Sequence, residues 1–118
     1  MTHPEQEALS VSEVLSRAAD LLEKPGAWTQ WAYGRDIFGD VEEDGSEMPT
    51  DPVCFCVQGA IGQVMGERPY GAPIYPVIGA LADHLGVPAV DVPVWNDAPG
   101  RTQAEVVSAL RAASEASQ

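Results

Sequence analysis

The stretch from Val94 to Ala113 constrains the fold most, because a specified turn leads directly into a clearly signalled helix. The turn is the polar run Asn96-Asp97-Ala98-Pro99-Gly100. Thr102 can cap the helix, and Glu105 can reach back to the N–H of that cap, which completes a capping box. Apolar residues then recur at helical spacing, at Val106, Ala109, Leu110 and Ala113. The pattern predicts a helix over 102–114 with one buried face.

A second capping box predicts a helix near the start of the chain, over 10–24. Ser10 supplies the cap and Glu13 the return bond, while Leu9 can pack against Val14 as a hydrophobic staple. Pro25-Gly26 ends the helix, because proline cannot continue it. The apolar stripe consists of Val11, Val14, Leu15, Ala18, Leu21 and Leu22.

Two further helices are expected in the middle of the chain, over 52–66 and 76–86. Asp51-Pro52 has the cap-then-proline order of a helix start, and Pro76 is expected at the first position of the later helix. Three glycines share one side of the first of these helices: Gly59, Gly62 and Gly66. Each costs about 1 kcal/mol relative to alanine, so we expect the close approach of another backbone to compensate.

Two segments favour extended structure. The spacing in residues 27–38 suits either a short helix or a strand, and the glycines that flank its β-compatible run favour the strand. Residues 89–95 alternate with period two, and Pro93 restricts them to a short or edge strand. Whether the two pair is left open. The expected fold is mainly α (α+β), with four helices and a small two-stranded β element in one domain over 1–118. Residues 1–8 and 114–118 are expected to fray.

The chain has a formal net charge of −12, from 18 acidic against 6 Lys and Arg residues. This charge disfavours direct contact with nucleic acid or anionic lipid and favours a basic partner surface. The acids concentrate before and within a loop predicted over 39–51, and such a run is usually only solvated surface. The candidate partner-binding residues are Asp36, Asp40, Glu42, Glu43, Asp44, Glu47 and Asp51.

The expected compartment and the expected lack of a cofactor depend on signals that the sequence does not contain. The first ten residues have no basic start followed by an apolar run, so no signal peptide is expected. No apolar run is long enough for a membrane span. Cys54 and Cys56 are too close to form an unstrained disulfide, so reduced thiols and a cytoplasmic location are expected. The acidic loop lacks the EF-hand spacing and the cysteines and histidines make a poor zinc set, so no metal or cofactor is expected.

One constellation suggests catalysis. Both cysteines fall in the expected first turn of the 52–66 helix, where N–H groups stabilise a thiolate. His84 and then Asn96 or Asp97 follow Cys56 in the chain order of papain-like hydrolases. The alternative is a buried cysteine that behaves as a small hydrophobe, beside a surface histidine.

Two other features admit both a structural and a binding role. The turn that contains Trp95, Asn96, Asp97 and Arg101 is either a brace or a recognition site at a helix N-terminus. The aromatic residues of 27–38 either fill a small core or stack on a ligand: Trp28, Trp31 and Tyr33.

The closing motif W-N-D-A-P-G-R-T-Q-A-E-V, with Trp28-Thr29-Gln30 and Phe55-Cys56-x-x-Gly59-Ala60, resembles a family of small uncharacterised proteins from actinobacteria and their phages. The resemblance covers most of residues 10–113 and implies a fold and an origin, not a mechanism. Cys54 and the acidic insert between Asp40 and Asp51 depart from the usual pattern.

The sequence therefore favours a non-enzymatic acidic interaction protein that binds a host protein and blocks a nucleic-acid-binding surface, its carboxylates taking the place of phosphates. A cysteine-dependent hydrolase or transferase is the second hypothesis. A ligand-binding or purely structural module built on the aromatic residues is the third. The oligomeric state cannot be read from the sequence.

Overall fold

The computed structural model describes residues 9–41 and 48–118, and the two capped helices lie where the sequence predicts them. Helix α1 spans Val11–Leu22 and helix α5 spans Gln103–Ala116, and each begins with a complete capping box. The fraying expected from residue 114 is wrong for the start of that segment, because α5 continues to Ala116. Ser114 is buried there, and its carbonyl oxygen accepts a 2.9 Å hydrogen bond from the hydroxyl of Ser12.

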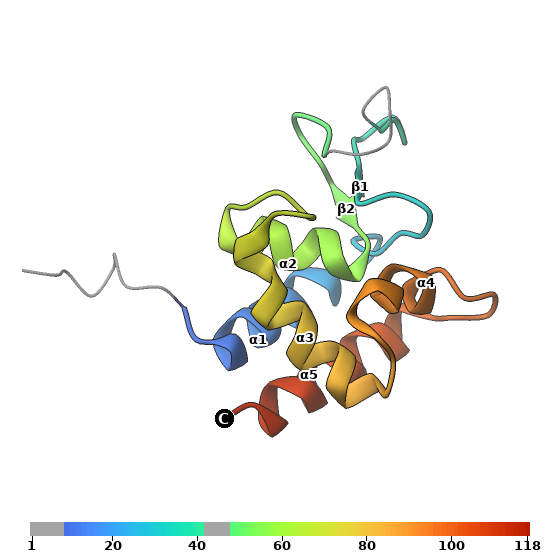
Figure 1. Cartoon of the computed structure of the whole chain (residues 1–118). Helices are drawn as coiled ribbons and strands as arrows, with labels where there is room; N and C mark the ends of the chain where they lie inside the picture. The colour runs from blue at the N-terminus through green and yellow to red at the C-terminus, as the bar shows by residue number, and fades with distance from the viewer. Residues whose placement is uncertain (1–8, 42–47) are drawn as a thin grey trace, which may run out of the picture.

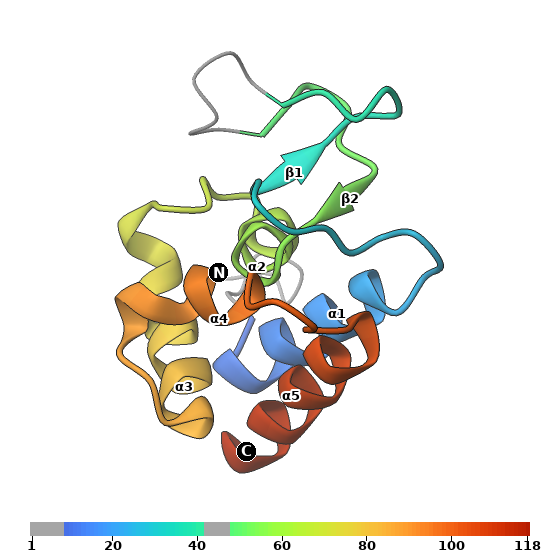
Figure 2. The same ribbon diagram turned by 90° about the vertical axis from the view of Figure 1, so that its right-hand side faces the viewer.

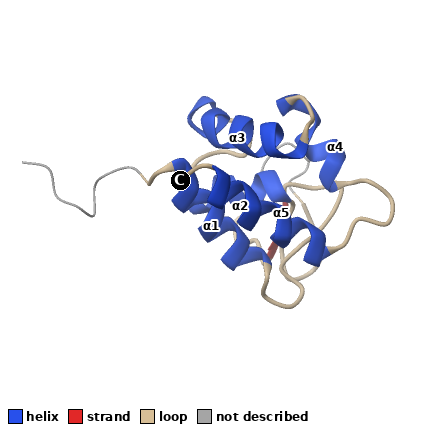
Figure 3. Cartoon of the chain, turned by 90° about the horizontal axis from the view of Figure 1, so that it is seen from below, coloured by secondary structure: helices blue, strands red, loops and turns tan. Residues whose placement is uncertain are grey.

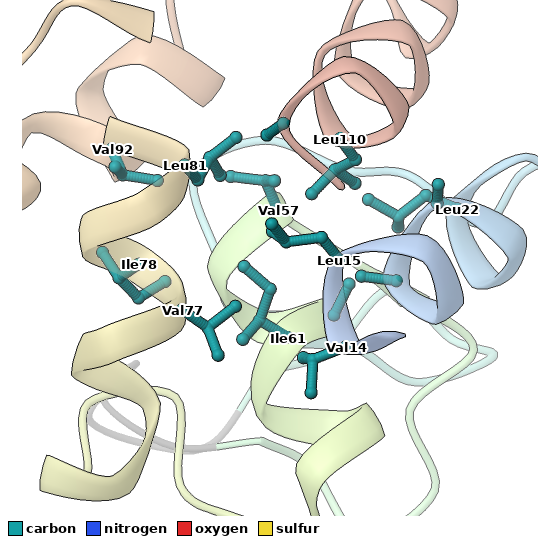
Figure 4. Packing of buried hydrophobic residues seen from close by; sticks show 14 of the residues in the cluster. Val14, Leu15, Leu22, Val57, Ile61, Val77, Ile78, Leu81, Val92 and Leu110 are labelled. Atoms are coloured by element: carbon teal, nitrogen blue, oxygen red, sulfur yellow. The ribbon is translucent and has the colours of Figure 1, made fainter. Parts of the chain in front are cut away.

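The core lies where four helices meet. Helix α1 packs against α5 and α2 (Val57–Met65), and α3 (Tyr75–Leu85), preceded by the short 3₁₀ helix η2 (Ala72–Ile74), closes the remaining side. Figure 4 shows the side chains of these helices converging. Leu15, Ile61, Leu81 and Leu110 are fully buried, so each helix contributes a large apolar side chain to one shared core.

Helix α2 begins at Val57, so the predicted start at residue 52 is wrong. The residues before it are extended instead. Strand β2 (Cys54–Phe55) pairs antiparallel with β1 (Gly34–Arg35), and Phe55 also exchanges backbone hydrogen bonds with Ala27 and Thr29. Long-range pairing therefore overrides the local signal of Asp51-Pro52, and Cys56 becomes the helix cap.

The close backbone approach expected at the glycines of α2 is confirmed for Gly59 and Gly62, and it is wrong for Gly66, where a Cβ atom would meet nothing within 4 Å. A Cβ atom at Gly59 would lie 1.9 Å from the carbonyl oxygen of Tyr33, and one at Gly62 would lie 2.9 Å from that of Glu67. Gly66 has the left-handed conformation that ends the helix. The first two glycines thus let neighbouring loops lie directly on α2.

The strand predicted over 89–95 is wrong. The segment forms the 3₁₀ helix η3 (Ala89–Asp91) and the short helix α4 (Val92–Asn96), with Pro93 in the first turn of α4. Val92 is buried while Val90 and Val94 are exposed, so the alternating valines do not share one face. The two-stranded sheet exists, but Cys54–Phe55 provides the partner of the 27–38 segment.

The fold is mainly α with a small β element, as predicted (Figure 3). Figures 1 and 2 both show the chain around β1 and β2 extending away from the helices. We call residues 35–41 and 49–53 the arm. No single helix among residues 9–41 and 48–118 is long and apolar enough to cross a membrane. The segments Ala72–Leu85 and Ala89–Asn96 have that length and apolar composition only when taken together, and they are bent by 84° relative to each other.

Candidate functional site

The side chain of Asn96 is the centre of the polar turn that the sequence singles out. It is fully buried at the end of α4, and its Oδ1 accepts hydrogen bonds from the indole N–H of Trp28 at 2.8 Å and from the backbone N–H of Val57 at 3.0 Å. Its Nδ2 donates to the carbonyl oxygen of Thr29 and to Asp97 Oδ1. Asn96 therefore joins α4, the start of α2 and the 28–29 segment, with both its oxygen and its nitrogen engaged.

Asp97 fixes the backbone conformation at Trp31, in the segment that packs against the turn. Its Oδ1 also accepts a 2.9 Å hydrogen bond from the backbone N–H of Trp31, whose φ of 67° is rare for a residue with a side chain. The amide of Gln30 adds bonds to the carbonyl oxygens of Asn96 and Ala98. We call this contact between residues 28–31 and 95–98 the junction.

Of the two alternatives for the aromatic residues of 27–38, filling a core is wrong for Trp31. The Trp31 side chain is 72% exposed, whereas Trp28 is half-buried and packs against the core. Tyr33 is half-buried. The junction thus holds the backbone of Trp31 and leaves its ring at the surface.

Arg101 and Trp95 support the turn from the other side. The Arg101 guanidinium lies 4.1 Å from the centre of the Trp95 ring, and its Nε donates to the Trp95 carbonyl oxygen. Its ion-pair partner is Glu105, at 3.5 Å, rather than Asp97. The hydroxyl of Thr102 already accepts from the N–H of Glu105, which engages the helix start at which an anion would bind. These contacts make the turn a brace.

Cys56 lies at the floor of a shallow hollow, but its thiol is not activated. The hollow is lined by Trp31, Ala32, Tyr33, Cys56, Pro93 and Asp97. Burial raises the pKa of Cys56 to about 11, although its sulfur accepts a hydrogen bond from the N–H of Gly59 at 3.3 Å. The lowered pKa expected from the helix start is therefore wrong, because desolvation outweighs the N–H donors, and the thiol is neutral near pH 7.

Asp97 lines the hollow together with Cys56, but the other members of the catalytic hypothesis do not. His84 is exposed in the last turn of α3 and does not line the hollow above Cys56. Asn96 directs its side chain to Trp28, Val57, Thr29 and Asp97. Cys54 lies in β2 rather than in a helix. Among the described residues, the hollow brings the Cys56 thiol together with the Asp97 carboxylate but with no histidine, and the thiol is neutral near pH 7.

The acidic residues of the predicted binding surface divide into three groups. Glu42, Glu43, Asp44 and Glu47 lie outside the described residues. Asp36 has a structural role, because its Oδ1 accepts from the N–H groups of Phe38 and Asp40 and so closes a turn. Asp40 and Asp51 are exposed on the arm.

Sequence reasoning missed the apolar side chains on the arm. Ile37 is 78% exposed, Phe38 84% and Val53 53%. With Val41 and Pro49 they line a hollow bordered by Asp36 and Asp51. The Ile37-Phe38 pair, which directly precedes the acidic run, carries the signal, but the pattern of 27–38 predicts that the pair belongs to a strand. The arm is thus an apolar surface with carboxylates at its edge.

Residues 9–41 and 48–118 contain no group of three or more His, Cys, Asp or Glu side chains placed to hold a metal ion. A comparison with family models matches residues 6–116 to DUF6197, a family of unknown function. No curated protein and no solved structure matches the chain. Evidence about activity therefore comes from the surface and the sites described above.

Proposed function

Because the chain belongs to DUF6197, a family of unknown function, we propose its role from its surface: it is a non-enzymatic interaction protein that binds a basic protein through the arm. The exposed apolar side chains around Phe38 carry the proposal. Exposed apolar groups rimmed by polar ones are typical of protein–protein interfaces, and a central aromatic side chain often supplies much of the binding energy.

Charge determines the kind of partner. The chain carries a formal net charge of −12, and Asp40 and Asp51 are exposed beside the apolar residues of the arm. A basic surface with an apolar centre complements this arrangement, and the opposite charges speed the encounter. Binding should therefore weaken as salt rises, but it should not vanish, because the apolar contact remains.

In its finer form, the proposal makes the partner a host protein that binds nucleic acid. The acidic stretch from Asp36 to Asp51 then occupies the basic surface on which phosphates would lie. The sequence resemblance supports an origin in actinobacteria or their phages, and the reduced cysteines support action in the cytoplasm. The chain would then act as an inhibitor by mimicry.

Site-specific photocrosslinking from position 37, which lies beside Phe38 on the arm and is 78% exposed, in an actinobacterial lysate, tests the proposal. We expect one basic protein to be crosslinked, and Phe38→Ser to abolish its capture while Val90→Ser preserves it. Val90 is a matched control, because it is 83% exposed and lies outside the arm. Added duplex DNA should compete with capture. Equal capture by wild type and Phe38→Ser would refute a role for the arm, and capture unaffected by DNA would refute the mimicry.

A further inference from the structure

A second surface, separate from the arm, is lined by aromatic side chains. Two hollows adjoin at Tyr33 and Pro93, which line both of them. The first extends to Trp31 and Asp97, and the second extends toward α3 and η3, to Tyr70, Tyr75 and Val90. We call the joined hollows the aromatic groove. No residue lines both the groove and the hollow of the arm.

We propose that the aromatic groove binds an extended, proline-containing peptide segment of a partner protein, with a basic side chain of that segment at Asp97. Polyproline II segments dock between aromatic rings because their conformation is already ordered before binding, so little entropy is lost. The groove offers the aromatic rings against which such a segment packs.

At the end of the groove away from Asp97, the tyrosine side chains contact one another and form an apolar surface. The Tyr33 and Tyr70 rings lie 6.3 Å apart at 45°, and the Tyr75 hydroxyl donates to the Tyr70 carbonyl oxygen at 3.2 Å. Tyr75 is 57% exposed and Val90 83% exposed. Proline rings suit such a surface, because they are apolar and lose little side-chain entropy on binding.

Charge complementarity sets the orientation of the peptide. Asp97 lies at one end of the groove, and both of its hydrogen bonds, from Trp31 and Asn96, end on Oδ1. All six lysine and arginine residues belong to the described part of the chain, and none lines the groove. An arginine of the peptide would meet this carboxylate and the exposed Trp31 ring together, which favours a planar cation over other side chains.

A fluorescence-anisotropy titration with synthetic peptides tests the proposal. The probe is a labelled ten-residue peptide with one arginine followed by a proline-rich run. One matched peptide replaces the arginine with glutamine, and another replaces the prolines with alanine. We expect the glutamine peptide to bind about tenfold more weakly, because loss of one charged hydrogen bond corresponds to that factor. The alanine peptide should also bind more weakly, because its backbone must be ordered on binding. Equal binding of the three peptides, or no binding at roughly 1 mM, would overturn the proposal.

Variants of the protein locate the site. Asp97→Asn keeps an oxygen for Trp31 and should weaken the arginine peptide about tenfold while leaving the glutamine peptide unchanged. Tyr75→Ala should abolish binding, and Tyr75→Phe, which retains the ring, should keep most of it. Phe38→Ser should leave the affinity unchanged, so loss of arm binding and loss of groove binding are distinguishable. Peptide binding that fails only in Phe38→Ser would show that the groove is not the site.

Discussion

The junction around Asn96 and the arm around Phe38 are both built largely from segments outside the main helices, yet they use their side chains in opposite ways. The Asn96 side chain is fully buried and makes four hydrogen bonds, so its polar groups hold the fold together. Phe38 is 84% exposed, so its apolar ring contributes little to the fold. A buried polar group and an exposed apolar group each depart from the usual pattern; the first holds the fold together, and the second is the observation on which the proposed partner binding depends.

Replacing Asn96 should produce the largest effect and provides the severest test of this contrast. In Asn96→Ala, the indole N–H of Trp28, the N–H of Val57 and the carbonyl oxygen of Thr29 lose their partner. Each unsatisfied buried group costs about 1–3 kcal/mol, so the free energy of unfolding should fall by roughly 3–5 kcal/mol in urea titrations. Asp97→Asn, which keeps the acceptor oxygen, should lose less than about 1 kcal/mol. Equal urea midpoints for the two variants would show that the junction is not a brace.

The junction also shows why part of the site could be predicted. The polar residues around Asn96 identify a turn from local chemistry alone, and the brace is one of the two interpretations that the sequence allows. Its partners are long-range: Trp28 lies 68 residues from Asn96 and Val57 lies 39 residues away. Nothing in the sequence near Asn96 identifies either of them.

The prediction of the two capped helices is correct and the prediction of the 89–95 strand is wrong for the same reason. A capping box is a complete local structure, so Ser10 and Glu13 make the same bonds in the fold as in the pattern. The alternating valines of 89–95 include no such local set of hydrogen bonds. A strand and a short helix both bury some of them, and which valines are buried depends on the core that Val92 joins. The exposure of Phe38 on the arm is harder still to predict, because it depends on whether any other part of the fold packs over the ring.

Gly59 and Gly79 provide the second test, which concerns how closely the backbone at Tyr33, next to the junction, packs on α2. In Gly59→Ala the new Cβ would meet the carbonyl oxygen of Tyr33 at 1.9 Å, so overpacking should lower the free energy of unfolding by about 1–3 kcal/mol or more. Gly79→Ala is the matched control. A Cβ there meets nothing within 4 Å, and helix propensity should stabilise the protein by about 0.5–1 kcal/mol. Thermal unfolding of both variants should give shifts of opposite sign; destabilisation of equal size in both would contradict the close approach.

The thiol of Cys56 provides a third test, visible only at alkaline pH. Because burial raises its pKa from 9.0 to about 11, the folded state keeps the proton that the unfolded chain releases. The stabilisation is complete below pH 9 and is lost as pH rises to 11. Relative to Cys56→Ser, which cannot titrate there, the wild type should lose about 2–3 kcal/mol over that interval.

Alkylation gives an independent measure of the same thiol. Iodoacetamide at neutral pH should modify the half-buried Cys54 before the buried Cys56, since reaction requires an accessible thiolate. Rapid alkylation of Cys56 in the native state, or an identical alkaline profile for Cys56→Ser, would reverse the assignment of Cys56 as a structural residue. It would also restore the hydrolase hypothesis.

The smallest expected effect is that of replacing Phe38, and Phe55, the other phenylalanine of the chain, is a control of matched chemistry and opposite burial. Phe38 is 84% exposed on the arm and Phe55 is 3% exposed in β2. Phe38→Ser should change the free energy of unfolding by less than about 0.5 kcal/mol, because the ring buries little surface, whereas Phe55→Ser should cost about 3–5 kcal/mol. Urea titrations of both variants measure the difference directly. A loss above about 1 kcal/mol for Phe38→Ser would mean that the ring serves the fold, and the main reason for assigning the arm to a partner would be gone.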